Sequence, residues 1–304
     1  MPINRRQFLS TTAIASSGML FGQNKLQPLQ FQVPNNFSLT ILATKWGFQG
    51  TYDDFCAKAK ADGYDGIEVW LPGDPKQQKE LFKAVEKYDL SFGLLAGAGG
   101  NDFPKHLATF KQNVKAAAET KPLFVNCHSG KDYFSFEENR QFIEFTLALE
   151  QETGIPIYHE THRAKILFAA HITRQFLEAF PELRLTLDIS HWCNVHSSLL
   201  QDQKEAVDLT LSRTHHVHSR VGFAHGPQVN DPRAPEWQKT VETHFDWWDK
   251  VVNQHVQAGT PLTMTTEFGP PGYMPTVPFT NQPITDLWTI NKHMKDLWRA
   301  RYSR

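Results

Sequence analysis

The sequence predicts an α/β fold, a single closed (β/α)8 barrel, on three observations. Short apolar runs typical of strands alternate with longer amphipathic runs typical of helices, and this alternation repeats eight times. Strict alternation implies parallel strands joined by helical crossovers. A chain of 304 residues holds eight such units as one domain, because α/β barrels of this size are routinely undivided. An open, doubly wound sheet is the alternative.

Strands and helices are expected at eight positions each along the chain. The eight strands are expected at 37–43, 66–70, 91–96, 123–127, 155–159, 183–188, 215–218 and 262–266. The helices that follow them are expected at 52–61, 75–88, 103–119, 136–151, 164–179, 203–211, 234–257 and 283–300. Asp53 and Asp54 stand at the start of the first helix, where carboxylates complement the helix dipole. The barrel is therefore expected to span 37–304, after a leading segment of 1–36.

The leading segment resembles an export signal followed by a linker. Arg5 and Arg6 precede Phe8-Leu9 and a weakly apolar run rich in Ser, Thr and Ala. This pattern is typical of a twin-arginine signal, and it predicts a folded protein that is periplasmic or secreted. A disordered basic terminus is the alternative. The apolar run is too short and too polar for a stable membrane span.

The composition argues against some classes of partner. The 31 Lys and Arg are balanced by 32 Asp and Glu, and the net charge is -1. No basic surface is therefore expected to attract nucleic acid or anionic lipid. Cys56, Cys127 and Cys193 lie in apolar contexts without paired spacing. They are expected to be buried free thiols and not a disulfide framework.

Polar side chains follow the later strands at their carboxyl ends, which in a barrel meet on one face. In chain order these strands supply Glu160, Asp188, a histidine that is either His216 or His218, and Glu267. Carboxylates packed together repel one another, and a cation removes that cost. Three carboxylates and one imidazole suit Mn²⁺, Mg²⁺, Co²⁺ or Zn²⁺. The sequence predicts one divalent ion here, and a polar barrel mouth without an ion is the alternative.

Four segments resemble the xylose isomerase-like TIM barrel superfamily, the sugar isomerase/epimerase group. They are 158–160, 187–191, 216–218 and 265–269, and 63–69 is similar to the second strand of that group. The resemblance covers about residues 39–298. It implies that Glu160, Asp188, His218 and Glu267 bind the metal, because these relatives use the second His of the His-x-His pair. It also implies that His191 contacts a substrate hydroxyl.

The resemblance further implies metal-dependent proton transfer beside a carbonyl, with Glu160 and Glu267 as the acid/base pair. The segment after the seventh strand departs from the family pattern, since it carries Arg220 and His225 where an acidic residue and a later Arg are expected. Arg220 could hold a carboxylate or a sugar oxygen. The substrate is expected to be a small carbohydrate. Its expected contacts are His191, His128, His162, Arg220, Lys45 and Trp70.

The predicted function is that of a divalent-metal-dependent sugar isomerase or epimerase, and other functions fit the same residues. A lyase could deprotonate carbon two of a 3-keto-glycoside and expel the aglycone from carbon one. A non-catalytic sugar-binding barrel is a further alternative. Trp46 and Trp70 could offer apolar walls to a sugar, or they could simply cap the barrel mouth. A DNA-repair endonuclease built on this barrel would need a basic face, which the charge balance disfavours.

Overall fold

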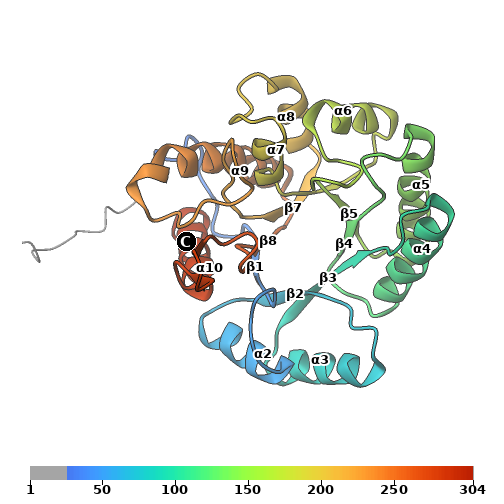
Figure 1. Cartoon of the computed structure of the whole chain (residues 1–304), viewed down its shortest axis with the longest axis horizontal. Coiled ribbons are helices and arrows are strands. Elements are labelled where there is room, and N and C mark those ends of the chain that lie inside the picture. Colours follow the sequence, from blue (N-terminus) through green and yellow to red (C-terminus); the bar gives the residue numbers. More distant parts are fainter. Residues whose placement is uncertain (1–25, 304) are drawn as a thin grey trace, which may run out of the picture.

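Eight parallel strands form a closed barrel in the computed structural model, which describes residues 26–303. The strands pair in chain order, and β1 pairs with β8 to close the ring, with Leu42 opposite Thr265. Figure 1 shows the strands at the centre and the helices arranged around them. The prediction of a single (β/α)8 barrel is confirmed, and the open sheet is excluded.

The strands of the barrel are short, and inward-facing and outward-facing side chains alternate along each of them. They are β1 Leu39–Thr44, β2 Gly66–Trp70, β3 Ser91–Gly97, β4 Val125–His128, β5 Ile157–Glu160, β6 Leu185–Leu187, β7 Thr214–His218 and β8 Leu262–Thr266. A separate antiparallel pair lies after β8 and consists of β9 Thr276–Val277 and β10 Gln282–Pro283.

The helices surround the strands, and several begin at residues that cap them. They are α2 Tyr52–Ala61, α3 Pro75–Lys87, α4 Phe103–Glu119, α5 Phe136–Thr153, α6 Ala170–Ala179, α7 Ser190–Val195, α8 Lys204–Leu211, η1 Pro235–Trp237, α9 Gln238–Ala258 and α10 Leu287–Tyr302. Thr51 and Asp54 form a capping box at α2, and Ser135 and Glu138 form one at α5. Such boxes satisfy backbone N–H groups that have no partner inside the helix.

Several elements differ from their sequence-based expectation. The last helix, expected from residue 283, begins at Leu287, because Gln282–Pro283 pairs with β9, and the helix expected from residue 234 begins at Gln238, after the 3-10 turn η1. The helix expected from residue 164 begins at Ala170, because Ala164 has a φ of 61° and the Ile166 N–H donates to the Ser129 carbonyl. The sixth strand ends at Leu187 and a short helix, α7, begins at Ser190. Asp188 turns the chain there, since its Oδ1 accepts the Ser190 N–H at 3.1 Å.

The main hydrophobic core lies between the barrel wall and the helices. Ile41 and Val125 contribute to it from the strands, and Phe55 and Phe142 from α2 and α5, all without solvent exposure. Residues 26–38 form no helix and no strand. Leu26 and Phe31 of this segment pack against the main core. The predicted twin-arginine signal lies outside the described residues.

The interior of the barrel is layered from apolar to polar. Leu42, Phe124 and Tyr158 form a small apolar cluster of their own. The next inward residues along the strands are polar and buried: Glu68, Asn126, His216 and Thr265. The last layer, at the carboxyl ends of the strands, holds the four predicted metal ligands. The inward-facing side chains therefore form an apolar layer at one end of the barrel and two polar layers toward the carboxyl ends of the strands.

The cysteines of residues 26–303 answer a further expectation. Cys56, Cys127 and Cys193 are buried and unpaired, which confirms the prediction of free thiols. Among the helices of this part of the chain, none combines the length and the apolar character needed to cross a bilayer.

Candidate metal centre

The four predicted ligands converge at the carboxyl ends of β5 to β8. Glu160 ends β5, Asp188 directly follows β6, His218 ends β7 and Glu267 directly follows β8. Each offers one ligand atom, and these atoms all lie within 4.8 Å of one another. Parallel strands place their carboxyl ends on one rim, so four residues distant in sequence meet at one point.

Several ligand atoms in this cluster are buried without a hydrogen-bond partner. They are Glu160 Oε1, His218 Nδ1 and Glu267 Oε2. His218 Nδ1 and Glu267 Oε2 lie 2.9 Å apart, yet without the alignment of a hydrogen bond. Buried polar atoms rarely stay unpartnered in proteins. A carboxylate oxygen and an imidazole nitrogen this close together fit shared coordination of a cation, and this ligand set suits a hard or borderline divalent ion.

The charges around the cluster are strongly coupled. Burial opposes ionisation of Glu160, but the imidazoles of His128 and His218 outweigh it and hold the pKa of Glu160 well below its usual value. Burial likewise opposes charge on His218, yet the carboxylates of Glu267, Glu68 and Glu160 raise its pKa well above the usual value. The cluster therefore retains negative charge that a cation can balance.

Arg220 lies inside this cluster, although it comes from the loop after β7. Its side chain is buried, its Nη2 forms an ion pair with Asp188 Oδ2 and lies 3.5 Å from Glu267 Oε2. The same nitrogen donates to His191 Nε2 at 2.8 Å. Burial and the carboxylates of Glu267 and Glu160 raise the pKa of Asp188, and Arg220 opposes that rise. Arg220 thus supplies a fixed positive charge beside the proposed ligands.

The predicted histidines form a wall next to Glu160. His128 Nε2 lies 2.7 Å from Glu160 Oε2, and the His162 ring packs between those of His128 and His191, with centroids 4.8 and 3.9 Å away. Burial lowers the pKa of His162 to about 3, which keeps its imidazole neutral. His128 and His162 line the cavity above the site, whereas His191 is fully buried behind them.

A cavity of about 500 Å³ opens above the cluster. Of the predicted substrate contacts, its lining includes Lys45, Trp70, His128, His162 and Arg220, together with the ligand Glu267. Trp46 and Tyr273 also line this cavity, and their rings meet edge to face. A side chain at Gly269 would place its Cβ 2.3 Å from the Trp46 ring, so glycine is needed for that ring to lie there. Aromatic walls with a few polar groups are typical of ligand sites.

A second cavity of about 550 Å³ adjoins the first and shares Trp70, Leu95 and His128 with it. Polar side chains line it, among them Asn113 and Lys165. Trp70 stands between the two cavities, half exposed, with its ring edge to face against His128. The cavity above the carboxylate cluster is therefore continued by a second one on the far side of Trp70.

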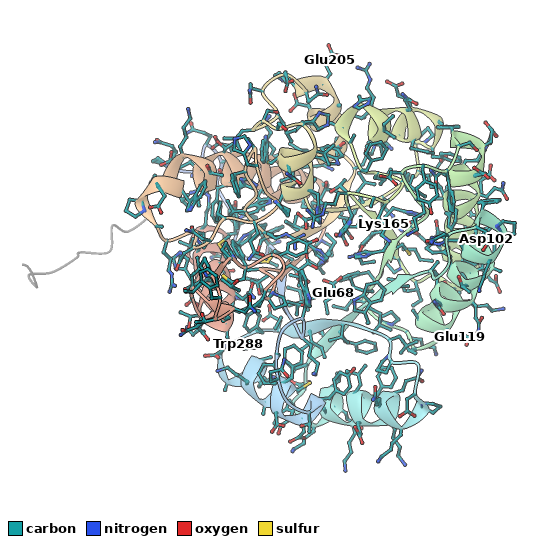
Figure 2. All side chains as sticks on the ribbon, in the orientation of Figure 1. Glu68, Asp102, Glu119, Lys165, Glu205 and Trp288 are labelled. Atoms are coloured by element: carbon teal, nitrogen blue, oxygen red, sulfur yellow. The ribbon has the colours of Figure 1, made fainter. Side chains whose placement is uncertain are left out.

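The sequence analysis assigned no role to Asn126 or Glu68, and it did not identify Tyr273. Asn126 Nδ2 donates to Glu160 Oε2 at 3.0 Å, and Glu68 lies beneath His218, near the centre of the ring of helices (Figure 2). The available signal was a carboxylate between Ile67 and Val69 in an apolar strand. Alternation turns that carboxylate toward the barrel axis. Tyr273 lies in the loop after β8, where no periodic pattern places it.

Several solved structures have a fold similar to that of this chain. No protein-family model matches the sequence, and no curated protein sequence matches it significantly. The D-allulose 3-epimerase from Methylomonas sp. is similar with a TM-score of 0.57 at 16% identity, covering 89% of this chain and 100% of that one. The 3-keto-D-glucoside 4-epimerase YcjR from E. coli has a TM-score of 0.55 at 14% identity, covering 86% and 100%.

A third similar structure is the probable 3-DHS dehydratase AsbF from Bacillus anthracis. Its TM-score is 0.56 at 16% identity, over 85% of this chain and 98% of that chain. At such identities the likeness concerns the fold. It agrees with the closed (β/α)8 barrel that the sequence predicts.

Proposed function

We propose that this protein is a divalent-metal-dependent sugar isomerase or epimerase that moves a proton on a carbon beside a carbonyl. One observation carries the proposal. Three carboxylates and one imidazole converge, with unpartnered ligand atoms, at the base of a cavity walled by tryptophan and histidine. The structural similarity to two sugar epimerases supports it.

Glu160, Asp188, His218 and Glu267 would hold the ion. A divalent ion at such a site stabilises negative charge on substrate oxygens, which makes the neighbouring C–H more acidic. Glu267 borders the cavity and is the group best placed to take a proton from a bound substrate. Glu160 Oε2 accepts a hydrogen bond from Asn126 and lies 2.7 Å from His128 Nε2. A proton could therefore pass between Glu160 and His128. Two carboxylates that differ in this way can serve as base and acid.

The remaining lining groups would bind the sugar. Trp70 and Trp46 offer apolar faces, and Lys45 and His162 offer a cation and a neutral imidazole. Arg220 would contact a substrate oxygen while it balances the charge of Asp188. A small carbohydrate with several hydroxyls fits this mixture of aromatic and polar groups.

The test begins with the purified protein. Metal analysis should find one divalent ion per chain, and Asp188→Asn should lower that occupancy while the barrel stays folded by circular dichroism. A panel of free ketoses, aldoses and 3-keto-glycosides is then followed by NMR in D₂O. A true substrate should gain deuterium on the carbon beside its carbonyl. Turnover without exchange, or an Asp188→Asn protein with full metal and full activity, contradicts the proposal.

A lyase acting on 3-keto-glycosides is the second candidate, and the second cavity favours it. That cavity adjoins the first across Trp70 and His128, and it would hold the part of a glycoside that leaves. The similarity to a dehydratase, an enzyme named for an elimination, also supports it. The product decides between the two candidates, because a rearranged sugar indicates an isomerase or epimerase and a released aglycone indicates a lyase.

We also propose export through the twin-arginine route, which rests on Arg5 and Arg6 ahead of Phe8-Leu9. Replacement of both arginines by lysine should leave the protein in the cytoplasm of the producing cell. Fractionation and immunoblotting measure this. Unchanged recovery from the periplasm contradicts the proposal.

A further inference from the structure

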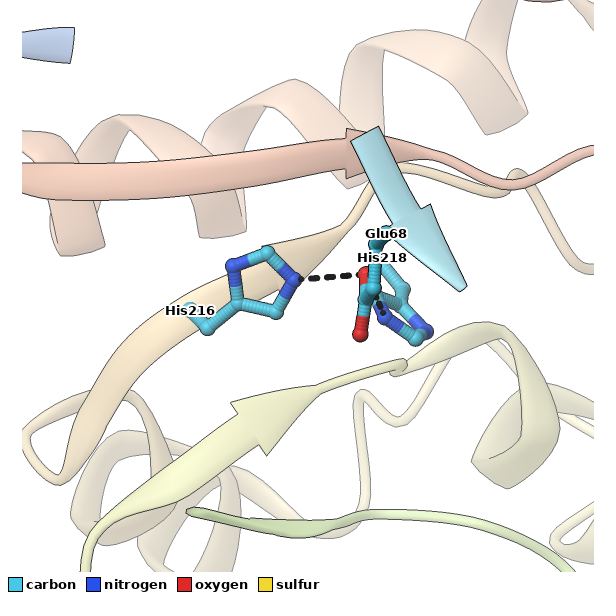
Figure 3. Close-up of side chains that lie close together, drawn as sticks. All are labelled: Glu68, His216 and His218. Atoms are coloured by element: carbon cyan, nitrogen blue, oxygen red, sulfur yellow. Dashed lines mark hydrogen bonds and ion pairs between the residues drawn. The ribbon is translucent and has the colours of Figure 1, made fainter. Parts of the chain in front are cut away.

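Glu68 lies inside the barrel, one layer below the candidate metal centre. It belongs to β2 and is fully buried. Its Oε2 lies 2.9 Å from His218 Nε2 and 3.2 Å from His216 Nε2, as the dashed lines in Figure 3 mark. The Thr265 hydroxyl donates to the same oxygen, and Asn126 Nδ2 lies 3.2 Å from Oε1.

A buried carboxylate is costly unless donors surround it, and Glu68 has four. The two imidazoles, a hydroxyl and an amide surround its two oxygens, and such contacts favour the carboxylate form. A carboxylate only accepts hydrogen bonds. The Nε2 atom of His218 therefore faces Glu68 as a donor. The Asn126 amide is also 3.2 Å from that atom, but it donates to Glu68 and to Glu160.

Glu68, His216 and His218 lie close enough together to hold an ion of their own, which would be a second metal site. Its atoms are already engaged. His216 Nδ1 lies 2.7 Å from Thr263 Oγ1, and both oxygens of Glu68 accept hydrogen bonds. The one atom of the trio without a hydrogen-bond partner is His218 Nδ1, and it points the other way, 2.9 Å from Glu267 and 3.7 Å from Glu160.

We propose that Glu68 is a positioning residue, which holds the proton of His218 on Nε2 and leaves Nδ1 free to bind the metal ion. The inference rests on the proposed function, since it assumes an ion at the four-ligand site. A carboxylate behind a metal-bound histidine fixes the ring orientation and the tautomer, and it strengthens the ligand. Asn126 extends this support, because it donates to both Glu68 and the ligand Glu160.

The test is Glu68→Gln in the full chain. Glutamine keeps the size but introduces an NH₂ group, which must face either the donors on Oε2 or the Asn126 amide. We expect Mn²⁺ to bind roughly 10–100-fold more weakly, the usual effect of losing such a partner. Isothermal titration of chelator-stripped protein measures the affinity and the number of ions. Thr263→Val is the matched control, because it removes the partner of His216 and should leave Mn²⁺ affinity unchanged.

A second measurement does not depend on the variant folding. In the Zn²⁺-loaded wild type, ¹⁵N NMR should show His218 with a protonated Nε2 and a metal-bound Nδ1. A His218 that binds Zn²⁺ through Nε2 overturns the inference, as do two ions per wild-type chain or a folded Glu68→Gln protein with wild-type affinity. A wild type that binds no divalent ion overturns the proposed function, and the inference with it.

Discussion

The two halves of the barrel mouth differ in what they contain. Strands β5 to β8 supply the three carboxylates, His218 and Arg220, of which all but Glu267, at 8% exposure, are 2% exposed or less. Lys45 and Trp46 directly follow β1, and Trp70 ends β2. Trp46 is 38% exposed and Trp70 is 50% exposed. One half is a buried ionic network, and the other is an open aromatic surface.

The difference separates two tasks. Buried charges keep their geometry because each one has a fixed partner, which suits acid/base and metal chemistry. Exposed aromatic rings bind a ligand without holding charge, and they tolerate different ligands. Variants in the ionic half should therefore change the rate, and variants in the aromatic half should change the apparent affinity for substrate.

The largest effect is expected from the two glutamates. Glu267→Gln or Glu160→Gln should lower kcat by roughly 10²–10⁴-fold, the usual contribution of a general acid or base. Glutamine preserves the size and one oxygen ligand, so folding should be retained. Steady-state kinetics on the substrate found in D₂O measure this, with Glu152→Gln on the exposed face of α5 as control. A kcat near that of the control would remove both residues from the chemistry.

The next effect concerns stability and tests whether the ionic half is a network. Arg220→Met should destabilise the metal-free protein by about 3–5 kcal/mol, because it leaves Asp188 and Glu267 buried without their cation. Urea unfolding in the presence of a chelator measures this. Arg220→Lys keeps the charge and should lose less. If the methionine variant is as stable as the wild type, the guanidinium is not what balances these carboxylates.

A third prediction uses pH to probe the packing beneath the ionic half. His244 on α9 is buried, with Nδ1 2.8 Å from the Thr240 carbonyl and Nε2 accepting the Gly222 N–H at 3.1 Å. Burial lowers the pKa of His244 to about 4. The unfolded chain binds this proton near its ordinary pKa, so stability falls as the pH drops from about 6.5 to about 4, by on the order of 3 kcal/mol.

Thermal unfolding between pH 7 and pH 4 measures this dependence. His244→Gln should flatten the curve over that window, because it removes the group that takes up the proton. His171→Gln provides a control at an exposed histidine of α6. Identical pH profiles for wild type and His244→Gln would show that this buried imidazole does not govern acid stability.

The smallest effect is expected in the aromatic half. Trp70→Ala should raise KM by about 2–10-fold, since one aromatic contact is worth about 0.5–1.5 kcal/mol, and it should leave kcat nearly unchanged. Phe279→Ala, at a fully exposed ring outside both cavities, is the matched control. A fall in kcat with unchanged KM would instead place Trp70 in the chemistry and erase the contrast between the halves.

The fold could be predicted because it depends on local patterns. Period-two and period-3.6 apolar repeats locate the eight strands and most helices, and strand ends identify Glu160, Asp188 and Glu267 as neighbours. The short helix α7 escaped this reasoning. Asp188 bonds the Ser190 N–H and turns the chain, a local hydrogen bond that competes with the apolar alternation.

The site could be predicted less completely, because its partners come from different strands. Arg220 was expected to meet substrate, and the structure adds its ion pair with Asp188, which lies 32 residues away in sequence. Glu68 meets His218 across 150 residues. No pattern along the chain shows which inward residues of a barrel share a layer, since that depends on the stagger between strands.

The pairing of β1 with β8 has a consequence for how the chain folds. Leu39 to Ala43 lie opposite Leu262 to Thr266, so the ring joins segments from the two ends of the described chain. Contacts of such sequence separation slow folding, because the entropy of closing a long loop is lost before they form. Until β8 has been synthesised, β1 keeps an unpaired edge that can associate with other chains. For a protein that we propose to be exported folded, closure of this seam would set the earliest moment of export, and substitutions along it would reduce yield before they reduce activity.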